Sequence, residues 1–297
     1  MNPLFEGIKA NDAKDLLNFI IMTLHLELNK EDNINENENK NCGPIDQTNK
    51  NLVYNLFKKD FDKKNHSIIS DLFYGINSNK TQCTICNTII YNYQIYFFIT
   101  FPLEEVRLFK NDMNSQQNQF NNNNIMINQN QNINFMINQQ IQNNIISTNN
   151  EVGIYDCFEY DRKTNFMTGE NRMYCNICKN TTDCHMTTNL ITGPEILILI
   201  FNRGKGKEFD VKINFVKDLD LNHYIEDANS VRNYKLIGVI SHLGESSMEG
   251  HFISYCRDLF EEDKWHKYND SIVTEVIDFQ KEVINFAMPY LLFYQKK

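Results

Sequence analysis

A histidine and an asparagine stand on two segments that the sequence predicts to be the strands of one hairpin. The runs Phe252–Arg257 and Lys264–Tyr268 are rich in β-forming residues and flank an acidic stretch that favours a turn. If the hairpin is centred on Phe260, His251 opposes Asn269. Side chains that oppose each other directly lie roughly 5 Å apart. The spacing therefore predicts contact between an imidazole and a carboxamide.

This pair suits general-base chemistry on a thiol. If the Oδ1 atom of Asn269 accepts the Nδ1–H of His251, the Nε2 atom remains free to take a proton, as in Cys-His-Asn hydrolase sites. The other interpretation is a packed or half-exposed histidine on a strand. Asn-Asp-Ser after a strand is also ordinary turn chemistry. The spacing alone leaves both interpretations open.

Four cysteines form two Cys-x-x-Cys motifs, Cys83 with Cys86 and Cys175 with Cys178. A chain without an export signal keeps its cysteines as thiols, so the paired spacing indicates a metal site and not disulfides. Two such motifs can present four thiolates in the tetrahedral arrangement of structural Zn²⁺. A redox use of one pair is the competing interpretation, but neither motif begins a helix after a strand.

Two further potential metal ligands lie close to the second motif. Cys184 and His185 follow it in the sequence and are near enough to replace one of its cysteines. We interpret them as packing residues.

Periodicity indicates the elements that must position these side chains. Asp12 precedes apolar residues at 16, 17, 20, 21 and 24, which predicts a capped helix that runs to about Leu28 with one apolar face. Residues 67–74 favour a helix or a helix-to-strand entry, followed by a strand that leads into the first cysteine motif. Residues 154–170 favour a short helix and a loop. From Glu195 onward, β-rich runs dominate.

An Asn/Gln-rich tract separates the two cysteine motifs. Between residues 111 and 150, 24 of the 40 residues are Asn or Gln, with hardly a charge. Such a tract shows no helical or strand period and cannot define a core, which predicts a disordered insertion.

Composition limits the class of protein. The 297 residues, of which 41% are apolar, are enough for one large domain or two small ones. The longest apolar runs, 95–101 and 196–201, suit buried strands and are too short to cross a membrane. The net charge of −9 argues against a general nucleic-acid binder. The N-terminus lacks a basic stretch followed by an apolar one, so we expect no secretion and a cytoplasmic or nuclear location.

The block around His251 resembles the histidine box of the ubiquitin-specific proteases. The likeness is carried by Gly250-His251-Phe252 and by Trp265-His-Lys-Tyr-Asn-Asp-Ser271. Residues 236–244 resemble the strand before that box, residues 289–294 the closing strand, and residues 193–203 the core strand upstream. Residues 12–17 resemble the family's Asp-Ala helix, although the usual Gln and Glu-Phe are altered here.

The resemblance implies an α+β fold of the papain-like cysteine protease type, with the palm and zinc-ribbon fingers present and the thumb largely missing. In this interpretation residues 1–297 form a partial protease domain. The fingers span 83–178 and are interrupted by the insertion at 111–150, and the palm sheet with the histidine box spans 195–297. The four cysteines of the motifs would bind structural Zn²⁺ at the tip of the fingers.

The implied activity is hydrolysis of the peptide or isopeptide bond after the C-terminal glycine of ubiquitin, so the expected partners are ubiquitin and ubiquitinated proteins, without nucleic acid or membrane. His251 would accept the thiol proton and Asn269 would orient its ring. Asp270 would be a second orienting group or would polarise the water or the oxyanion. The segment 244–250 resembles a blocking loop over the channel for the ubiquitin tail, the alternative being an ordinary turn.

The nucleophile has no match. In these proteases the reactive cysteine lies in an Asn-x-Cys-Tyr/Phe box that begins a helix well before the Asp-Ala helix. Cys42 precedes Gly-Pro in a polar loop, which does not suit a helix N-terminus that activates a thiol. Cys157 and Cys256 also lack the box. We therefore expect no catalytic cysteine in this chain and expect it to be a fragment of a longer deubiquitinase. The alternative is an inactive ubiquitin-binding module.

Overall fold

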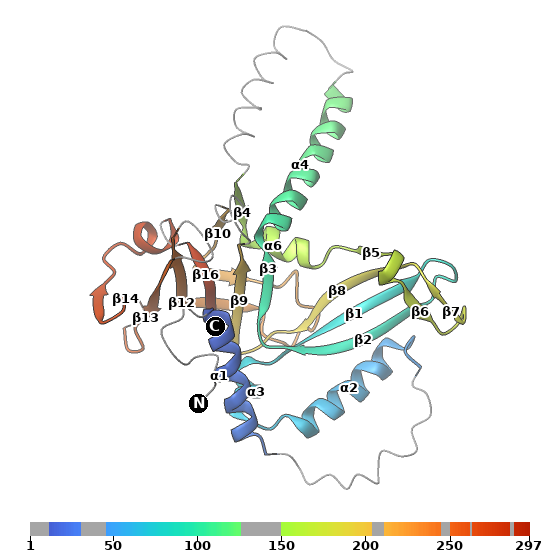
Figure 1. The fold of residues 1–297 in the computed structure, drawn as a ribbon, viewed down its shortest axis with the longest axis horizontal. Coiled ribbons are helices and arrows are strands. Elements are labelled where there is room, and N and C mark those ends of the chain that lie inside the picture. Colours follow the sequence, from blue (N-terminus) through green and yellow to red (C-terminus); the bar gives the residue numbers. More distant parts are fainter. Residues whose placement is uncertain are drawn as a thin grey trace.

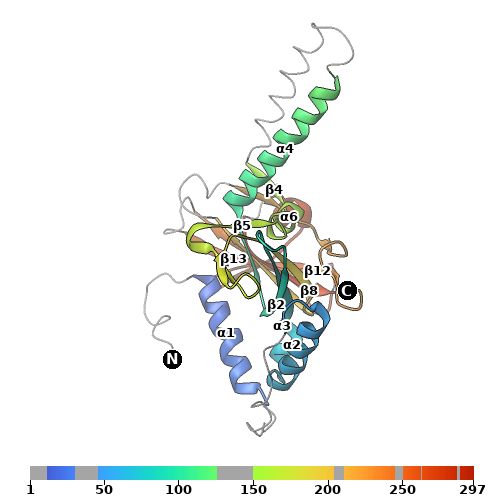
Figure 2. The ribbon, with the colours of Figure 1, turned by 90° about the vertical axis from the view of Figure 1, so that its right-hand side faces the viewer.

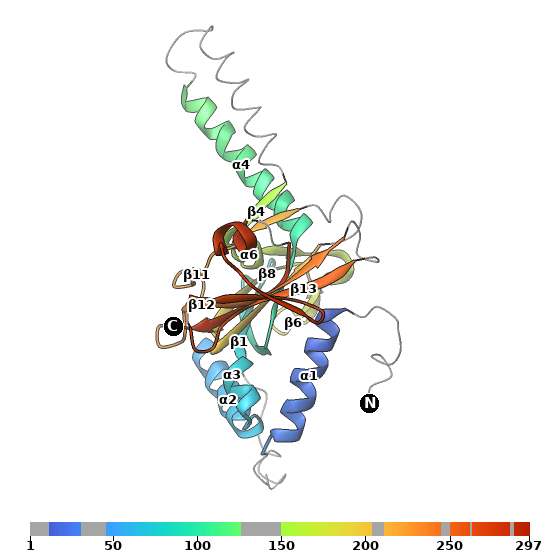
Figure 3. The same ribbon diagram turned by 90° about the vertical axis from the view of Figure 1, so that its left-hand side faces the viewer.

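The computed structural model describes residues 12–30, 46–125, 150–203, 211–244, 250–261, 263–285 and 288–297. Its body is built around one large sheet, from which a smaller sheet extends (Figure 1). The helices α1, α2 and α3 lie on one side of this body, and the long helix α4 projects from the other (Figures 2 and 3).

The large sheet contains eight strands and carries the predicted histidine and asparagine. In spatial order it contains β15 (Ile272–Glu275), β14 (Trp265–Asn269), β13 (His251–Arg257), β12 (Asn233–Leu243), β16 (Pro289–Lys296), β9 (Ile196–Asn202) and β3 (Ile99–Pro102), with β11 (Asp218–Asp220) paired to β12. All neighbours are antiparallel except β3 and β9. The predicted apolar run in β9 is buried from Leu197 to Phe201, as expected for a strand covered on both faces.

The main core lies against one face of this sheet. There α6 (Ile154–Asp161) packs its buried Phe158 edge to face on Phe101 of β3, with ring centroids 5.2 Å apart, and Phe201 of β9 stacks on the same ring. A parallel two-stranded ribbon of β4 (Glu151–Gly153) and β10 (Lys212–Asn214) lies beside α6. The predicted short helix at 154–170 is confirmed in its first half.

The smaller sheet carries the cysteine motifs. It has the order β2-β1-β8-β5, and its strands are β2 (Ile89–Tyr96), β1 (Gly75–Cys83), β8 (Cys184–Thr192) and β5 (Asn165–Met167). The hairpin of β6 (Met173–Cys175) and β7 (Asn180–Thr182) lies at its far end, after the turn η3 (Gly169–Asn171) (Figure 1). Although residues 83–178 include β3, α4 and α6, these three elements belong to the body around the large sheet.

Helix α1 (Ala13–Leu28) has the predicted bounds, and Asp12 caps it by accepting a hydrogen bond from the backbone N–H of Lys14. Its apolar face is less buried than its pattern predicts. Ile21 is 3% exposed and, with the partly buried Leu17, packs on the sheet beside α3, whereas Leu16, Ile20 and Leu24 are exposed by 44%, 43% and 39%. Only one edge of the stripe therefore contacts the described body.

Two further helices follow α1. The short α3 (Ile68–Phe73) is predicted, and Ser67 and Ser70 form a capping box at its start. Helix α2 (Lys50–Lys64) packs on β2 and was not predicted, although Leu52, Val53, Leu56, Phe57 and Phe61 recur at helical spacing.

Helix α4 (Leu103–Ile125) corrects the prediction for the Asn/Gln-rich tract. Residues 111–125 are helical, contrary to the absence of a helical period, and residues 126–149 lie outside the described part. The first turn nucleates the helix by burying Leu103 and Val106, and each added residue then gains a hydrogen bond at small entropic cost. No helix in the described ranges is long and apolar enough to span a membrane.

Candidate active site

His251 and Asn269 lie on neighbouring strands, but in a register that differs from the predicted one. Ser254 pairs with Tyr268 and Arg257 with Trp265, which centres the hairpin on residue 261 and places Asn269 opposite residue 253. The predicted pairing of His251 with Asn269, which assumed a hairpin centred on Phe260, was therefore wrong by two residues along β13. The acidic turn sets the true register, because Asp258 accepts hydrogen bonds from the backbone N–H groups of 260 and 261.

The two side chains nevertheless meet. The Nε2 atom of His251 lies 2.5 Å from Oδ1 of Asn269, so Nε2–H donates to the amide oxygen. The contact runs diagonally across the strand pair, within reach of these side chains. The prediction named the wrong ring nitrogen: Nδ1, and not Nε2, remains as the basic atom.

Asp270 lies at the edge of this pair. Its backbone has a φ of 51° in the turn after β14, and its Oδ2 atom lies 3.8 Å from Nε2 of His251. This carboxylate is 80% exposed, so its interaction with the imidazole is screened by water. Asp270 thus lies near the same ring nitrogen that bonds Asn269.

The residue before the histidine fits closely against a second, buried histidine. A Cβ atom on Gly250 would lie 2.2 Å from the ring of His242, which packs on Phe252 with ring centroids 4.8 Å apart. Burial lowers the pKa of His242, because the charged form loses its hydration. The segment 245–249 of the predicted blocking loop lies outside the described residues.

Beside the pair lies a cavity of about 390 Å³ between the start of α1 and strands β13 and β14, with Asp12 and Asp270 among its lining residues. The phenol of Tyr290 donates to both carboxylate oxygens of Asp12, at 2.7 and 2.8 Å, and its ring lies 5.7 Å from that of Phe252. Tyr290 thus joins the first turn of α1 to the strand that carries His251. No local pattern predicts this link, because 278 residues separate the partners.

None of the described cysteines outside the two motifs faces His251. Cys157 is fully buried in α6, where burial raises the pKa of its thiol. Cys256 lies five residues from His251 on the same strand and therefore on the opposite face of the sheet. Cys184 is buried in the smaller sheet, and Cys42 lies outside the described residues.

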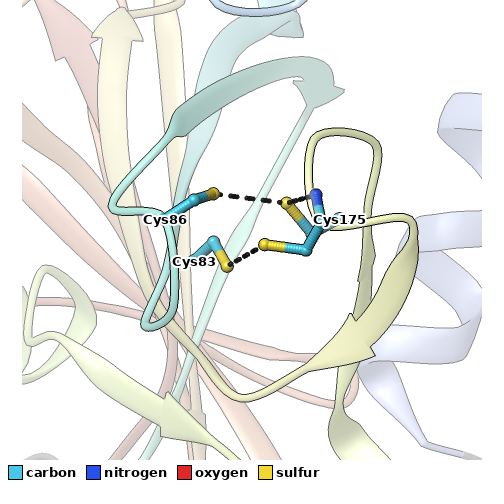
Figure 4. A group of neighbouring side chains, drawn as sticks. Cys83, Cys86 and Cys175 are labelled. Atoms are coloured by element: carbon cyan, nitrogen blue, oxygen red, sulfur yellow. Dashed lines mark hydrogen bonds between the residues drawn. The ribbon is translucent and has the colours of Figure 1, made fainter.

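The four motif cysteines converge at the far end of the smaller sheet (Figure 4). Their sulfur atoms all lie within 4.8 Å of one another, with Cys83 3.8 Å from Cys178 and Cys86 3.6 Å from Cys175. A tetrahedral Zn²⁺ site with Zn–S bonds of about 2.3 Å requires sulfur separations of about 3.8 Å. The donor set therefore fits zinc, and the gathering of all four thiols disfavours redox use of a single pair.

The two motifs also share a local geometry. Asn87 and Lys179, each directly after the second cysteine of its motif, have φ values of 56° and 54° and turn the chain back into a strand. Hydrogen bonds from the backbone at Cys86 and from the Thr182 hydroxyl lower the pKa of the Cys83 thiol to about 6. A lowered thiol pKa favours the metal-binding thiolate at Cys83, whereas contact with Cys86 raises the pKa of the Cys178 thiol to about 12.

The two neighbouring candidates do not join the cluster. The ring of His185 lies 5.2 Å from that of Phe166, and Cys184 is buried opposite Cys83. Neither belongs to the group of four sulfurs.

The family model described as ubiquitin carboxyl-terminal hydrolase matches residues 1–294. The chain belongs to this family. It is 22% identical to ubiquitin carboxyl-terminal hydrolase 2 of Gallus gallus over 99% of this chain and 70% of the relative. It is 23% identical to the Homo sapiens enzyme of the same name, again over 99% of this chain but 41% of the relative.

Solved structures share the fold. In the SAGA Ubp8/Sgf11/Sus1/Sgf73 DUB module bound to ubiquitin aldehyde, the matching chain has a TM-score of 0.55 and 19% identity, over 97% of this chain and 50% of that chain. A second structure of the Ubp8-Sgf11-Sgf73-Sus1 module gives a TM-score of 0.56 at 19% identity. The chain thus spans about half the length of these chains. The predicted family and its mixed α/β fold are confirmed.

Proposed function

We propose that the chain supplies the general base and its orienting group to a cysteine-type deubiquitinase that hydrolyses the bond after the C-terminal glycine of ubiquitin. The observation that carries this proposal is the hydrogen bond between His251 and Asn269 in a chain of the ubiquitin carboxyl-terminal hydrolase family. The Ubp8 module bound to ubiquitin aldehyde, which has the same fold, supports ubiquitin as the partner.

In the proposed mechanism each side chain has one role. Asn269 holds the Nε2–H of His251, which leaves Nδ1 as the ring nitrogen that accepts the thiol proton. The thiolate attacks the carbonyl carbon of the glycine, and Nδ1–H then protonates the leaving lysine amine. In the second half-reaction Nδ1 takes a proton from water, which attacks the thioester and releases ubiquitin and the thiol. Asp270 stabilises the imidazolium from the solvent side.

The nucleophile in this scheme comes from outside the described cysteines. Cys157 and Cys256 are buried or face away from His251, and burial raises the pKa of both thiols, which suppresses the reactive thiolate. Because Cys42 stands in a polar sequence before Gly-Pro, we propose that a cysteine box beyond this sequence completes the site. The chain alone is then inactive.

The proposal also assigns the two sheets to the subdomains of the protease and assigns Zn²⁺ to the four-cysteine cluster. The large sheet acts as the palm, and the smaller sheet with its terminal hairpin acts as the fingers. Zn²⁺ bound by the four motif cysteines ties β1 to the β6–β7 hairpin and supplies a structural cross-link, with no part in bond cleavage. We place the protein in the cytoplasm or the nucleus, with ubiquitin and ubiquitinated proteins as partners.

The test uses the natural polypeptide that contains this sequence and the fluorogenic substrate ubiquitin-7-amido-4-methylcoumarin. His251→Ala should lower kcat/KM by about 100-fold to 10,000-fold, the usual contribution of a general base. His185→Ala is the matched control, because the ring of that histidine packs against Phe166 in the smaller sheet. Equal activity of both variants would refute the assignment of the base.

A thiol-reactive ubiquitin C-terminal probe tests the location of the nucleophile. The 297-residue chain by itself should remain unlabelled, whereas its binding to ubiquitin persists. Covalent labelling at Cys42 would show that the nucleophile lies within this chain.

A further inference from the structure

A fifth cysteine lies directly beside the four-cysteine cluster. Cys184 opens β8 and pairs with Cys83, which ends β1, in the antiparallel register of the smaller sheet. The two residues are 1% and 5% exposed. Because directly paired residues project from the same face of a sheet, the two thiols lie on one side of it.

The backbone places this pair at a spacing suited to a disulfide. The N–H of Thr84 donates to the carbonyl of Asp183 at 3.1 Å, so the neighbouring pair 84/183 is the hydrogen-bonded one. Cys83 and Cys184 therefore occupy a non-hydrogen-bonded position, where Cα atoms lie about 4.5 Å apart. This separation is within the range of about 4.4 to 6.8 Å that disulfides span.

Cys184 is the thiol at this site that stays outside the metal cluster. The cluster consists of Cys83, Cys86, Cys175 and Cys178, so bound Zn²⁺ would hold all of these and leave Cys184 outside its coordination shell. A cavity of about 340 Å³ is lined by Cys83, Cys175 and Cys184. It is large enough to admit a small peroxide to the sulfur of Cys83.

We propose that Cys83 and Cys184 form a reversible disulfide in response to hydrogen peroxide, and that this bond releases the zinc. The Cys83 thiolate attacks one peroxide oxygen, giving a sulfenic acid and hydroxide. The sulfur of Cys184 then attacks the sulfenic sulfur of Cys83, which forms the S–S bond. The sulfenic OH leaves as water with the proton of the Cys184 thiol, and the hydroxide from the first step takes a proton from solvent to give a second water molecule. The two sulfurs lose two electrons, and one peroxide is reduced. The proposal rests on the zinc assignment and does not depend on hydrolytic activity.

The disulfide converts the cluster into a three-cysteine site. Cys83 cannot ligate the metal while it is bonded to Cys184, so zinc loses one of its four ligands and its affinity falls. The link between β1 and the β6–β7 hairpin is then lost, whereas the bond between β1 and β8 is strengthened. A reductant returns Cys83 to the cluster.

The chain offers a direct readout by peptide mapping. Trypsin separates the thiols into residues 81–107 with Cys83 and Cys86, 173–179 with Cys175 and Cys178, and 180–203 with Cys184. Zinc-loaded full chain is treated with one equivalent of hydrogen peroxide, alkylated and digested without reductant. We expect peptide 81–107 linked to 180–203, together with zinc release that a chromogenic chelator detects and that reductant with added zinc reverses.

Two variants complete the test. Cys184→Ala should bind zinc normally and lose the cross-linked peptide. After a second equivalent of peroxide, which oxidises the sulfenic acid of Cys83 to the sulfinic acid, this variant should fail to recover zinc on reduction. Cys256→Ala, which removes a half-buried thiol from the large sheet, should behave as the parent chain does. A link between 81–107 and 173–179, an absence of any link, or full zinc recovery in Cys184→Ala would each overturn the proposal.

Discussion

Replacement of Gly250 by alanine tests how tightly the strand that carries His251 is fixed. The added Cβ would lie 2.2 Å from the ring of His242 and 2.8 Å from the carbonyl oxygen of Leu243. The ring cannot move aside freely, because it is only 9% exposed and packs against Phe252. Overpacking of this kind costs about 1 to 3 kcal/mol, and the lower entropy of an unfolded alanine returns about 0.4 to 1 kcal/mol. We expect a net loss of about 1 to 2 kcal/mol.

Urea denaturation followed by circular dichroism measures this loss. Gly238→Ala is the matched control on β12, because its Cβ would meet Phe293 at 3.6 Å, an ordinary contact. The midpoint of Gly250→Ala should fall with an unchanged slope, whereas Gly238→Ala should remain near the parent value. In the natural polypeptide, Gly250→Ala should also reduce ubiquitin hydrolysis, since its strain displaces His251. Equal midpoints for the two variants would refute the close packing at Gly250.

Three further predictions follow from contacts elsewhere in the chain. Tyr290→Phe removes both hydrogen bonds to the exposed carboxylate of Asp12 and should lower the unfolding free energy by about 1 kcal/mol in urea denaturation. Burial lowers the pKa of His25 below 6.5, so in acid the unfolded chain binds more protons than the folded chain does. The unfolding free energy, measured from pH 5 to 8, should therefore fall as the pH drops below 6.5, and it should fall less steeply in His25→Gln. Cys175→Ser should abolish the binding of about one equivalent of Zn²⁺ per chain, measured by elemental analysis.

Each of these predictions has a result that contradicts it. Unchanged stability of Tyr290→Phe would mean that the phenol does not fasten α1. Stability that is independent of pH below 6.5, or an unaltered slope in His25→Gln, would remove the role of the buried imidazole next to Ser67. Full zinc content in Cys175→Ser would exclude the four-cysteine site.

The two cysteine motifs show what short-range spacing can predict. In each motif the cysteines are three residues apart, and a single left-handed residue closes each turn, so local geometry brings each pair of thiols together. Helix α1 was predicted equally well, because Asp12 and the apolar period after it are local signals. The repeated spacing also predicted that the two distant motifs share one metal, and the family resemblance added their place at the tip of the fingers.

The hairpin and the long helix show where such inference ends. The register of β13 and β14 depends on how Asp258 caps the turn, and a symmetric centre is a poor substitute for that bonding. The predicted ring nitrogen was also wrong, because Nε2 and not Nδ1 bonds Asn269. Helix α4 continues into the Asn/Gln-rich tract because buried Leu103 and Val106 anchor its start, information that composition does not contain.

The contacts at the base of α4 determine where the coding sequence can gain or lose codons without disturbing the sheets. Lys110 donates to the carbonyl of Glu151 at 3.1 Å and lies 2.9 Å from the carboxylate of Asp156, so the chain on either side of residues 111–150 meets at one point on the body (Figure 1). Codons gained or lost between these anchors leave the register of every strand in both sheets unchanged. The tract can therefore change in length during evolution without altering the hydrolase fold.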